Sequence, residues 1–108
     1  MGEVHKIEVE MTFLSKEEGG RQHPPALTTP SSYRPHVVVE NGEYLGVLFL
    51  SAPEFVLANS AFSATLGLLY YPQVDYSPLV PGAEFTVREG LHVVGRGRVI
   101  NRWIEHVA

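Results

Sequence analysis

Three arginines in the last part of this sequence have the type and spacing of an anion-binding row. Arg96, Arg98 and Arg102 all occupy even positions in a stretch that alternates like a strand. Because side chains two residues apart on a strand point to the same face, all three are predicted to share one face with His92. Such a row could bind an RNA backbone. We favour the alternative, a solvated face whose arginines pair with glutamates on neighbouring strands.

Histidine is the other potential ligand in this chain. There are five, and they are scattered: His5, His23, His36, His92 and His106. None forms a pair with metal-ligand spacing and acidic neighbours, and there is no cysteine to complete a zinc site. We expect surface or rim histidines, with no bound metal and no cofactor.

The sequence lacks the motifs that indicate catalysis. Neither Lys6 nor Lys16 follows a glycine, so the sequence has no phosphate-binding loop and no site for GTP and its magnesium. Without cysteine there is no thiol nucleophile, and no serine lies in a nucleophile elbow. Glu17 and Glu18 are adjacent carboxylates whose directions diverge, which favours a turn-stabilising role near Arg21. We expect that the protein is not an enzyme.

The composition is typical of one small globular domain, predicted to span residues 1–108. Hydrophobic residues make up 44% of the chain, enough for one modest core. The net charge is −4, so any RNA contact would need a local basic patch. No apolar run approaches the length of a membrane span, about 20 residues, and no secretory signal is visible. We expect a cytoplasmic protein with no membrane partner.

Hydrophobic residues recur at every second position along most of the chain, which is the period of a strand. Strands are predicted at residues 6–13, 36–40, 44–50, 62–70, 85–87 and 91–104. Asn41-Gly42 is a strong hairpin signal between the second and the third, and residues 17–35 are predicted to be loop. A helix competes only at 58–69, where Gly67 and the flanking prolines favour a strand. The pattern favours an all-β fold, a small six-stranded antiparallel β-barrel.

A loop rich in tyrosine and proline is predicted near residues 70–81. It carries Tyr70, Tyr71 and Tyr76 around Asp75. Tyrosine offers a large amphipathic contact area and proline stiffens the backbone, so the loop could bind a partner or a second copy through Tyr71 and Tyr76. In the alternative, the tyrosines fold back and plug one end of the barrel.

Three motifs occur in order along the chain. Residues 14–21 read Leu-Ser-Lys-Glu-Glu-Gly-Gly-Arg, residues 33–35 read Tyr-Arg-Pro, and residues 85–99 contain Phe-x-x-Arg-Glu-Gly and Val-Gly-x-Gly-x-Val. Gly46 follows the second motif at a matching distance. In these motifs and their spacing the chain resembles the C-terminal (third) domain of bacterial elongation factor Tu, over roughly residues 6–104. The resemblance implies the same six-stranded barrel.

In that family this domain contacts the T-arm of aminoacyl-tRNA, the exchange factor and its own sister domains. The resemblance places the tRNA-contacting positions at Arg21, Gln22, His36, Leu45 and Gly90. Arg21 and Gly90 match the family, whereas the other three replace a histidine, a glutamine and a threonine respectively. A leucine in place of threonine cannot form a hydrogen bond to sugar or phosphate.

Two kinds of binding function follow from these features. We expect a non-catalytic binding module, a stand-alone domain without a GTPase domain, whose partner is a protein. The alternative is a module related to translation elongation that binds tRNA or another RNA through Arg21, Gly90 and the arginine row.

Overall fold

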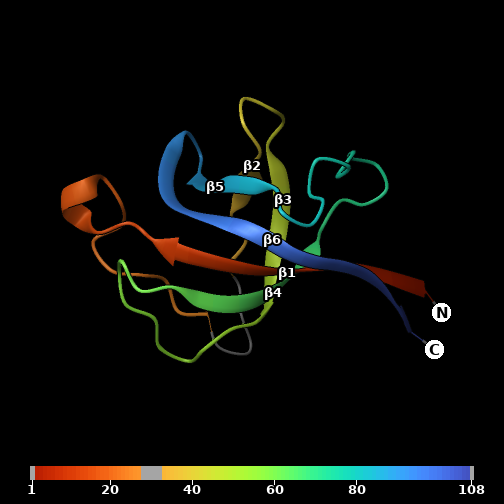
Figure 1. Ribbon diagram of the computed structural model, residues 1–108, viewed down its shortest axis with the longest axis horizontal. Coiled ribbons are helices and arrows are strands. Elements are labelled where there is room, and N and C mark those ends of the chain that lie inside the picture. The colour runs from red at the N-terminus through yellow and green to blue at the C-terminus, as the bar shows by residue number, and fades with distance from the viewer. Residues whose placement is uncertain (1, 28–32, 108) are drawn as a thin grey trace.

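Six strands and one short helical turn make up the described part of the protein. The computed structural model describes residues 2–27 and 33–107, so part of the predicted loop, at 28–32, lies outside the described residues (Figure 1). The elements are β1 (Gly2–Phe13), η1 (Lys16–Glu18), β2 (His36–Val38), β3 (Leu45–Ser51), β4 (Phe62–Leu68), β5 (Glu84–Glu89) and β6 (His92–Val107). The strands form a closed barrel in the order β1-β4-β3-β2-β5-β6, and all neighbouring strands are antiparallel. The predicted all-β, six-stranded antiparallel barrel is confirmed.

The two longest strands are β1 and β6, the first and last along the chain. Gly2 pairs with Val107 at one end of their ladder, and Phe13 pairs with Gly95 at the other. β4 pairs with β1 only as far as Lys6, so the outer part of the β1–β6 ladder runs past the barrel as a two-stranded ribbon beside the termini (Figure 1). Both strands therefore exceed their predicted ranges, because they keep pairing beyond the barrel.

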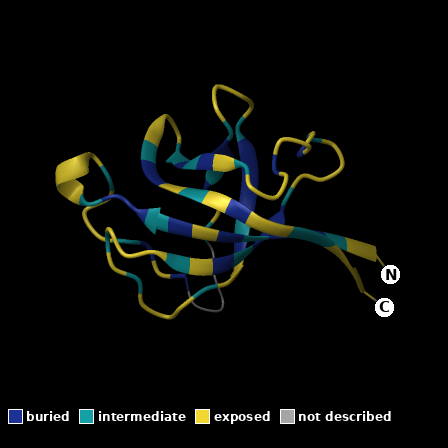
Figure 2. Ribbon diagram, in the orientation of Figure 1, coloured by how far each residue is buried: buried dark blue, intermediate teal, exposed yellow. Residues whose placement is uncertain are grey.

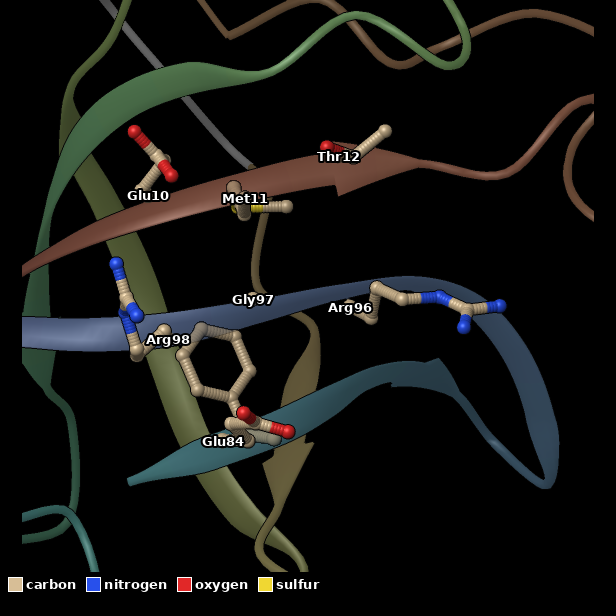
Figure 3. A pocket seen from close by; sticks show the side chains of 8 residues that line it. Glu10, Met11, Thr12, Glu84, Arg96, Gly97 and Arg98 are labelled. Atoms are coloured by element: carbon tan, nitrogen blue, oxygen red, sulfur yellow. The ribbon is translucent and has the colours of Figure 1, made fainter. Parts of the chain in front are cut away.

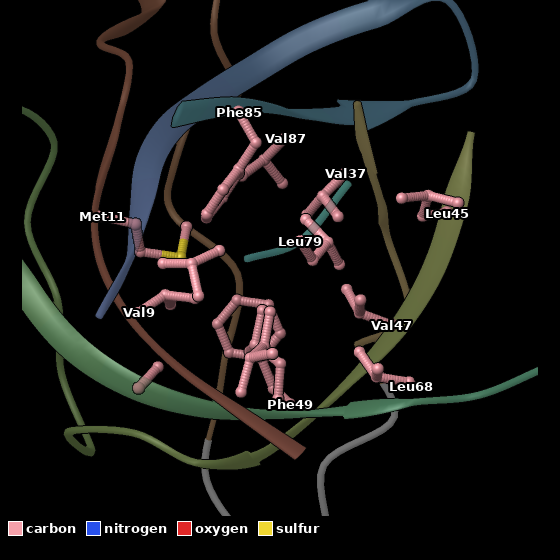
Figure 4. Close-up of a cluster of buried hydrophobic side chains, with 14 of the residues drawn as sticks. Val9, Met11, Val37, Leu45, Val47, Phe49, Leu68, Leu79, Phe85 and Val87 are labelled. Carbon is pink, nitrogen blue, oxygen red and sulfur yellow. The ribbon is translucent and has the colours of Figure 1, made fainter. Parts of the chain in front are cut away.

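Hydrophobic side chains that alternate along the strands fill the barrel. On β1, Ile7, Val9, Met11 and Phe13 are buried, whereas the residues between them are half-buried or exposed. Figure 2 shows this alternation as bands along the strands, and Figure 4 shows the buried side chains converging from opposite walls. The period of two that predicted the strands thus produces one hydrophobic core.

Gly97 lets β6 pass close to its neighbours. A Cβ atom at this position would lie 2.7 Å from the Glu10 carbonyl oxygen and 2.8 Å from Cζ of Phe85. Since real Cβ atoms essentially never come so close, the Val-Gly-x-Gly-x-Val motif has a packing role in which β6 lies tightly against β1 and the core.

The predicted β2–β3 hairpin forms with a different turn. The Gly42 N–H donates to the Val39 carbonyl at 3.0 Å, and the residue with positive φ is Glu40, at 55°. Because this backbone conformation is not extended, β2 ends at Val38 and not at residue 40 as predicted. The short β2 therefore pairs with β5 only as far as Val38 with Thr86.

Candidate interaction surfaces

Arg21 forms an ion pair with the end of β5. Its Nη1 donates to Glu89 Oε2 at 2.7 Å, and its Nε donates to the His23 carbonyl oxygen at 3.1 Å. The Tyr33 hydroxyl donates to the same Glu89 oxygen at 2.7 Å, and the guanidinium carbon of Arg21 lies 5.9 Å from the centre of the Tyr33 ring. The charge of Arg21 is therefore balanced within the chain, and a phosphate would have to compete with Glu89 for it.

The first motif forms the turn that carries Arg21. The backbone N–H of Ser15 donates to Glu18 Oε1 at 3.1 Å, its hydroxyl donates to the same oxygen at 2.9 Å, and Gly19 takes a φ of 93°. The hydrogen bond from the Ser15 backbone is the main cause that lowers the pKa of the Glu18 carboxyl. The predicted turn-stabilising role near Arg21 is confirmed for Glu18.

The five positions implied by the resemblance do not form one surface. Arg21, Gln22 and Gly90 are exposed, and the ion pair to Glu89 brings Arg21 next to Gly90. His36 is half-buried on β2, with its ring 5.8 Å from that of Tyr44. Leu45 is only 1% exposed and lies in the core (Figure 4). The candidate contact at Leu45 is wrong, because β3 turns this apolar side chain inward.

Tyr44 also organises the outer face of β5. The Arg88 Nη1 donates to the Tyr44 hydroxyl at 3.1 Å, and the guanidinium carbon lies 5.4 Å from the ring centre. Arg88 Nε donates to the Thr86 hydroxyl at 3.0 Å. Sequence reasoning did not select Arg88 as a site residue, and its hydrogen bond to Tyr44 links β5 to the residue just before β3.

The arginine row is interrupted by two β-bulges in β6. Glu8 pairs with Asn101 and Val9 with Val99, which leaves Ile100 as an extra residue. The side chain of Arg102 therefore lies on the other face from Arg96 and Arg98, and its Nη1 donates to the carbonyl oxygens of Tyr76 at 2.7 Å and Leu79 at 3.4 Å.

A second bulge removes His92 from the face that Arg96 and Arg98 share. Val87 pairs with Gly95 and Arg88 with Val93, so Val94 is the extra residue of a second bulge. Each bulge reverses the alternation beyond it, and the predicted common face of Arg96, Arg98, Arg102 and His92 is wrong. Only Arg96 and Arg98 keep it.

Arg98 lies between two acidic side chains. It pairs across strands with Glu10 of β1 and with Glu84 of β5. All three line a hollow of about 330 Å³ over Gly97, and Figure 3 shows Arg98 extending toward Glu10 while Arg96 extends along β6 away from it. With a carboxylate on each neighbouring strand, this hollow has no net positive charge to attract an anion.

The loop between β4 and β5 is fastened to the barrel through Tyr76. Tyr76 is 1% exposed, its hydroxyl donates to the Gly46 carbonyl at 2.7 Å, and the Tyr70 N–H donates to that hydroxyl at 3.1 Å. The predicted contact role of Tyr76 is wrong, because the ring fills the barrel end. Tyr71 is 40% exposed and its ring stacks on His5 at 3.6 Å. His5 is thereby buried, contrary to the surface position predicted for it.

Sequence reasoning missed an exposed apolar pair on the β3–β4 connection. Phe55 is 85% exposed and Leu57 is 73% exposed, whereas Val56 between them packs against the core. Phe55 also lines a hollow of about 270 Å³ with Pro24 and Pro25 of the loop after η1. The available signal was Phe-x-Leu in a segment punctuated by Pro53 and Asn59, where no strand would bury both side chains.

Other kinds of site receive no support in residues 2–27 and 33–107. No three acidic or histidine side chains converge there to hold a metal ion, and no helix there has the length and apolarity to cross a membrane. Every buried side-chain nitrogen or oxygen in this part of the chain has a hydrogen-bond partner. No protein-family model matches the sequence.

Proposed function

We propose that this protein is a non-catalytic binding module whose partner is another protein. The observation that carries the proposal is the pair of large apolar side chains, Phe55 and Leu57, that the β3–β4 connection leaves exposed. Val56 anchors the connection to the core, so the pair is held outward on a fixed support. Exposed apolar side chains grouped beside a hollow are typical of contact surfaces for proteins.

Energetics favour these side chains as the centre of an interface. Fully burying a Leu or Phe side chain contributes about 1.5–3 kcal/mol relative to leaving it exposed. Pro24 and Pro25 line the adjoining hollow and have little conformational entropy to lose on binding. We propose that the module acts in the cytoplasm. Burial of Phe55 and Leu57 together would stabilise its complex with a partner protein there.

RNA binding is the alternative, and the geometry of the arginines weighs against it. Arg21 is paired with Glu89, Arg102 donates to loop carbonyls, and Arg98 lies between two glutamates. The net charge of −4 adds a general repulsion of phosphate. The resemblance to the third domain of elongation factor Tu remains a prediction, and so does the tRNA binding that it implies.

A capture experiment tests the proposal. The intact chain is immobilised, exposed to an extract of its source cells, and the retained protein and RNA are quantified. We expect one or a few proteins to be retained, and to be lost from a variant carrying Phe55→Ser and Leu57→Ser. Leu91→Ser is the matched control, because Leu91 is 90% exposed at a different turn. Retention of RNA alone, or the same proteins on all three chains, would contradict the proposal.

A further inference from the structure

The closed barrel has an incomplete ladder where β2 ends, since β2 pairs with only part of β5. β2 pairs with β5 only from His36 with Arg88 to Val38 with Thr86, although β5 begins at Glu84. Glu84 therefore pairs with Arg98 of β6 on one side, and no described strand pairs with it on the other. A strand position with one open side can accept an added extended segment through its main chain.

A groove lies beside this incomplete ladder. Its volume is about 910 Å³, and it runs between the β2–β3 turn and the end of the β4–β5 loop. Val39, Val80 and Ala83 give it an apolar lining, while Glu40 and Glu84 belong both to this groove and to an adjoining hollow of about 400 Å³. The two glutamates thus lie at the boundary between the groove and the hollow.

Neither glutamate forms an ion pair in the described part of the chain, although Arg98 pairs across strands with Glu84 and Arg96 lines the adjoining hollow with both glutamates. Ion pairs in that part join Lys6 to Glu105 and Arg21 to Glu89, and His5 and His106 both approach Glu3. Glu40 and Glu84 take part in none of them. Two carboxylates over an apolar lining are complementary to lysine or arginine, whose aliphatic stem can lie on apolar surface while the charged head meets the acid.

We propose that this groove binds an extended, lysine- or arginine-bearing segment of the partner protein. The inference rests on the proposed function and assigns the chemistry of the partner. The open side of β5 at Glu84 supplies main-chain hydrogen bonding, the valines hold the aliphatic stems, and Glu40 and Glu84 select positive charge. The net charge of −4 steers a basic partner toward the chain and disfavours an acidic one.

Peptide binding followed by NMR tests the groove. The probe is a capped peptide of alternating lysine and valine, and the comparison peptide has glutamate in place of lysine. We expect saturable binding of the lysine peptide that weakens with salt, with amide shift changes at Glu40, Gly82 and Glu84. The double variant Glu40→Gln, Glu84→Gln should bind it about tenfold less tightly, as expected for the loss of two exposed charge contacts.

Glu54→Gln is the matched control, because Glu54 is an exposed glutamate on the β3–β4 connection and should leave binding unchanged. Thermal melting of each variant checks that the fold is kept. Equal binding of both peptides, no binding, or shift changes confined to other surfaces would overturn the groove proposal. That result leaves the Phe55 and Leu57 interface standing, since its own capture experiment fails or succeeds without the lysine peptide.

Discussion

Tyr76 shows how a single side chain fixes the connection between β4 and β5. Its ring is buried, and its hydroxyl both donates to the Gly46 carbonyl and accepts from the Tyr70 N–H. The carbonyl oxygen of the same residue accepts from Arg102 of β6. A buried hydroxyl without partners would be costly, and here each capacity is used. The loop is thus attached to β3 and β6 at one residue.

Removing only the hydroxyl of Tyr76 should destabilise the fold. Tyr76→Phe keeps the ring but leaves the Tyr70 N–H without its acceptor, and the Gly46 carbonyl keeps only its hydrogen bond from the Leu69 N–H at 3.2 Å. These losses should lower the free energy of unfolding by about 1–3 kcal/mol. Urea unfolding followed by circular dichroism measures the change. Tyr71→Phe is the control, because Tyr71 is 40% exposed. Equal losses in the two variants would show that the buried hydroxyl contributes nothing special.

Tyr33 should make the protein sensitive to alkali. Burial, and after it the hydrogen bond to Glu89, raise the pKa of Tyr33 above its ordinary value of 10.0. A phenol whose pKa is raised on folding stabilises the folded state below the unfolded pKa, and this contribution is lost as the pH rises above it. Denaturant midpoints should therefore fall above about pH 10.

The variant Tyr33→Phe isolates that effect. The denaturant midpoint of this variant should fall less steeply than that of the parent over the same alkaline range, because the phenylalanine ring cannot ionise. Some decline should persist, since burial also raises the pKa of Tyr76. Parallel alkaline curves for parent and variant would mean that Tyr33 is not the group responsible.

At the level of elements, β6 shows which parts of the fold the sequence could reveal. Hydrophobic alternation located most of the strands, since each buries one face in the core, whereas three consecutive valines and the Asn41-Gly42 signal located the β2–β3 hairpin. The bulges at Ile100 and Val94 add one residue each without any residue type that marks them. Alternation counted through them put Arg102 and His92 on the wrong face, because position along a bulged strand no longer fixes direction.

Whether a candidate contact residue is exposed depends on tertiary packing more than on the local sequence pattern. Leu45 was selected by the resemblance, and Tyr76 by the composition of its loop. Residues distant in sequence decide where each side chain lies: Leu45 packs in the barrel interior, and Tyr76 packs in the core with its hydroxyl bonded to Gly46. Phe55 and Leu57 were missed because an apolar side chain in a connection is ordinarily expected to fold inward. In both cases tertiary packing decided what local sequence left open.

Gly97→Ala tests the close approach of β6 to its neighbours. The new methyl group would meet the Glu10 carbonyl and the Phe85 ring, and main chain cannot move aside cheaply, so stability should drop by about 1–3 kcal/mol. Gly2→Ala on the paired strand is the control, since nothing lies within 4 Å of its added Cβ. Thermal unfolding measures both variants. A neutral Gly97→Ala would show that the strands can separate without penalty.

For the whole molecule, some basic side chains are engaged within the chain, although Lys16, Arg34, Arg96 and Arg98 form no ion pair in its described part. Arg21, Lys6 and Arg102 are engaged within the chain, whereas Glu40 and Glu84 form no ion pair in its described part. With a net charge of −4, the surface as a whole favours basic partners.

An electrophoretic mobility shift with tRNA at low salt tests this distribution. We expect no shift at protein concentrations where specific complexes form, because Arg21, the arginine that the resemblance places at tRNA, is already paired with Glu89. Arg21→Ala should then migrate like the parent. A shift that disappears steeply with added salt and drops with Arg21→Ala would reverse the preference for a protein partner.

Pairing of β1 with β6 imposes an order on folding during synthesis. β1 emerges from the ribosome well before β6, yet its longest ladder forms only once β6 has been made. Until then Ile7, Val9, Met11 and Phe13 have no complete wall to cover them, and the hairpins of the middle must form without a closed barrel around them. Contacts between distant segments slow folding, so nascent chains should spend time with an uncovered apolar strand that other proteins, or chaperones, can bind.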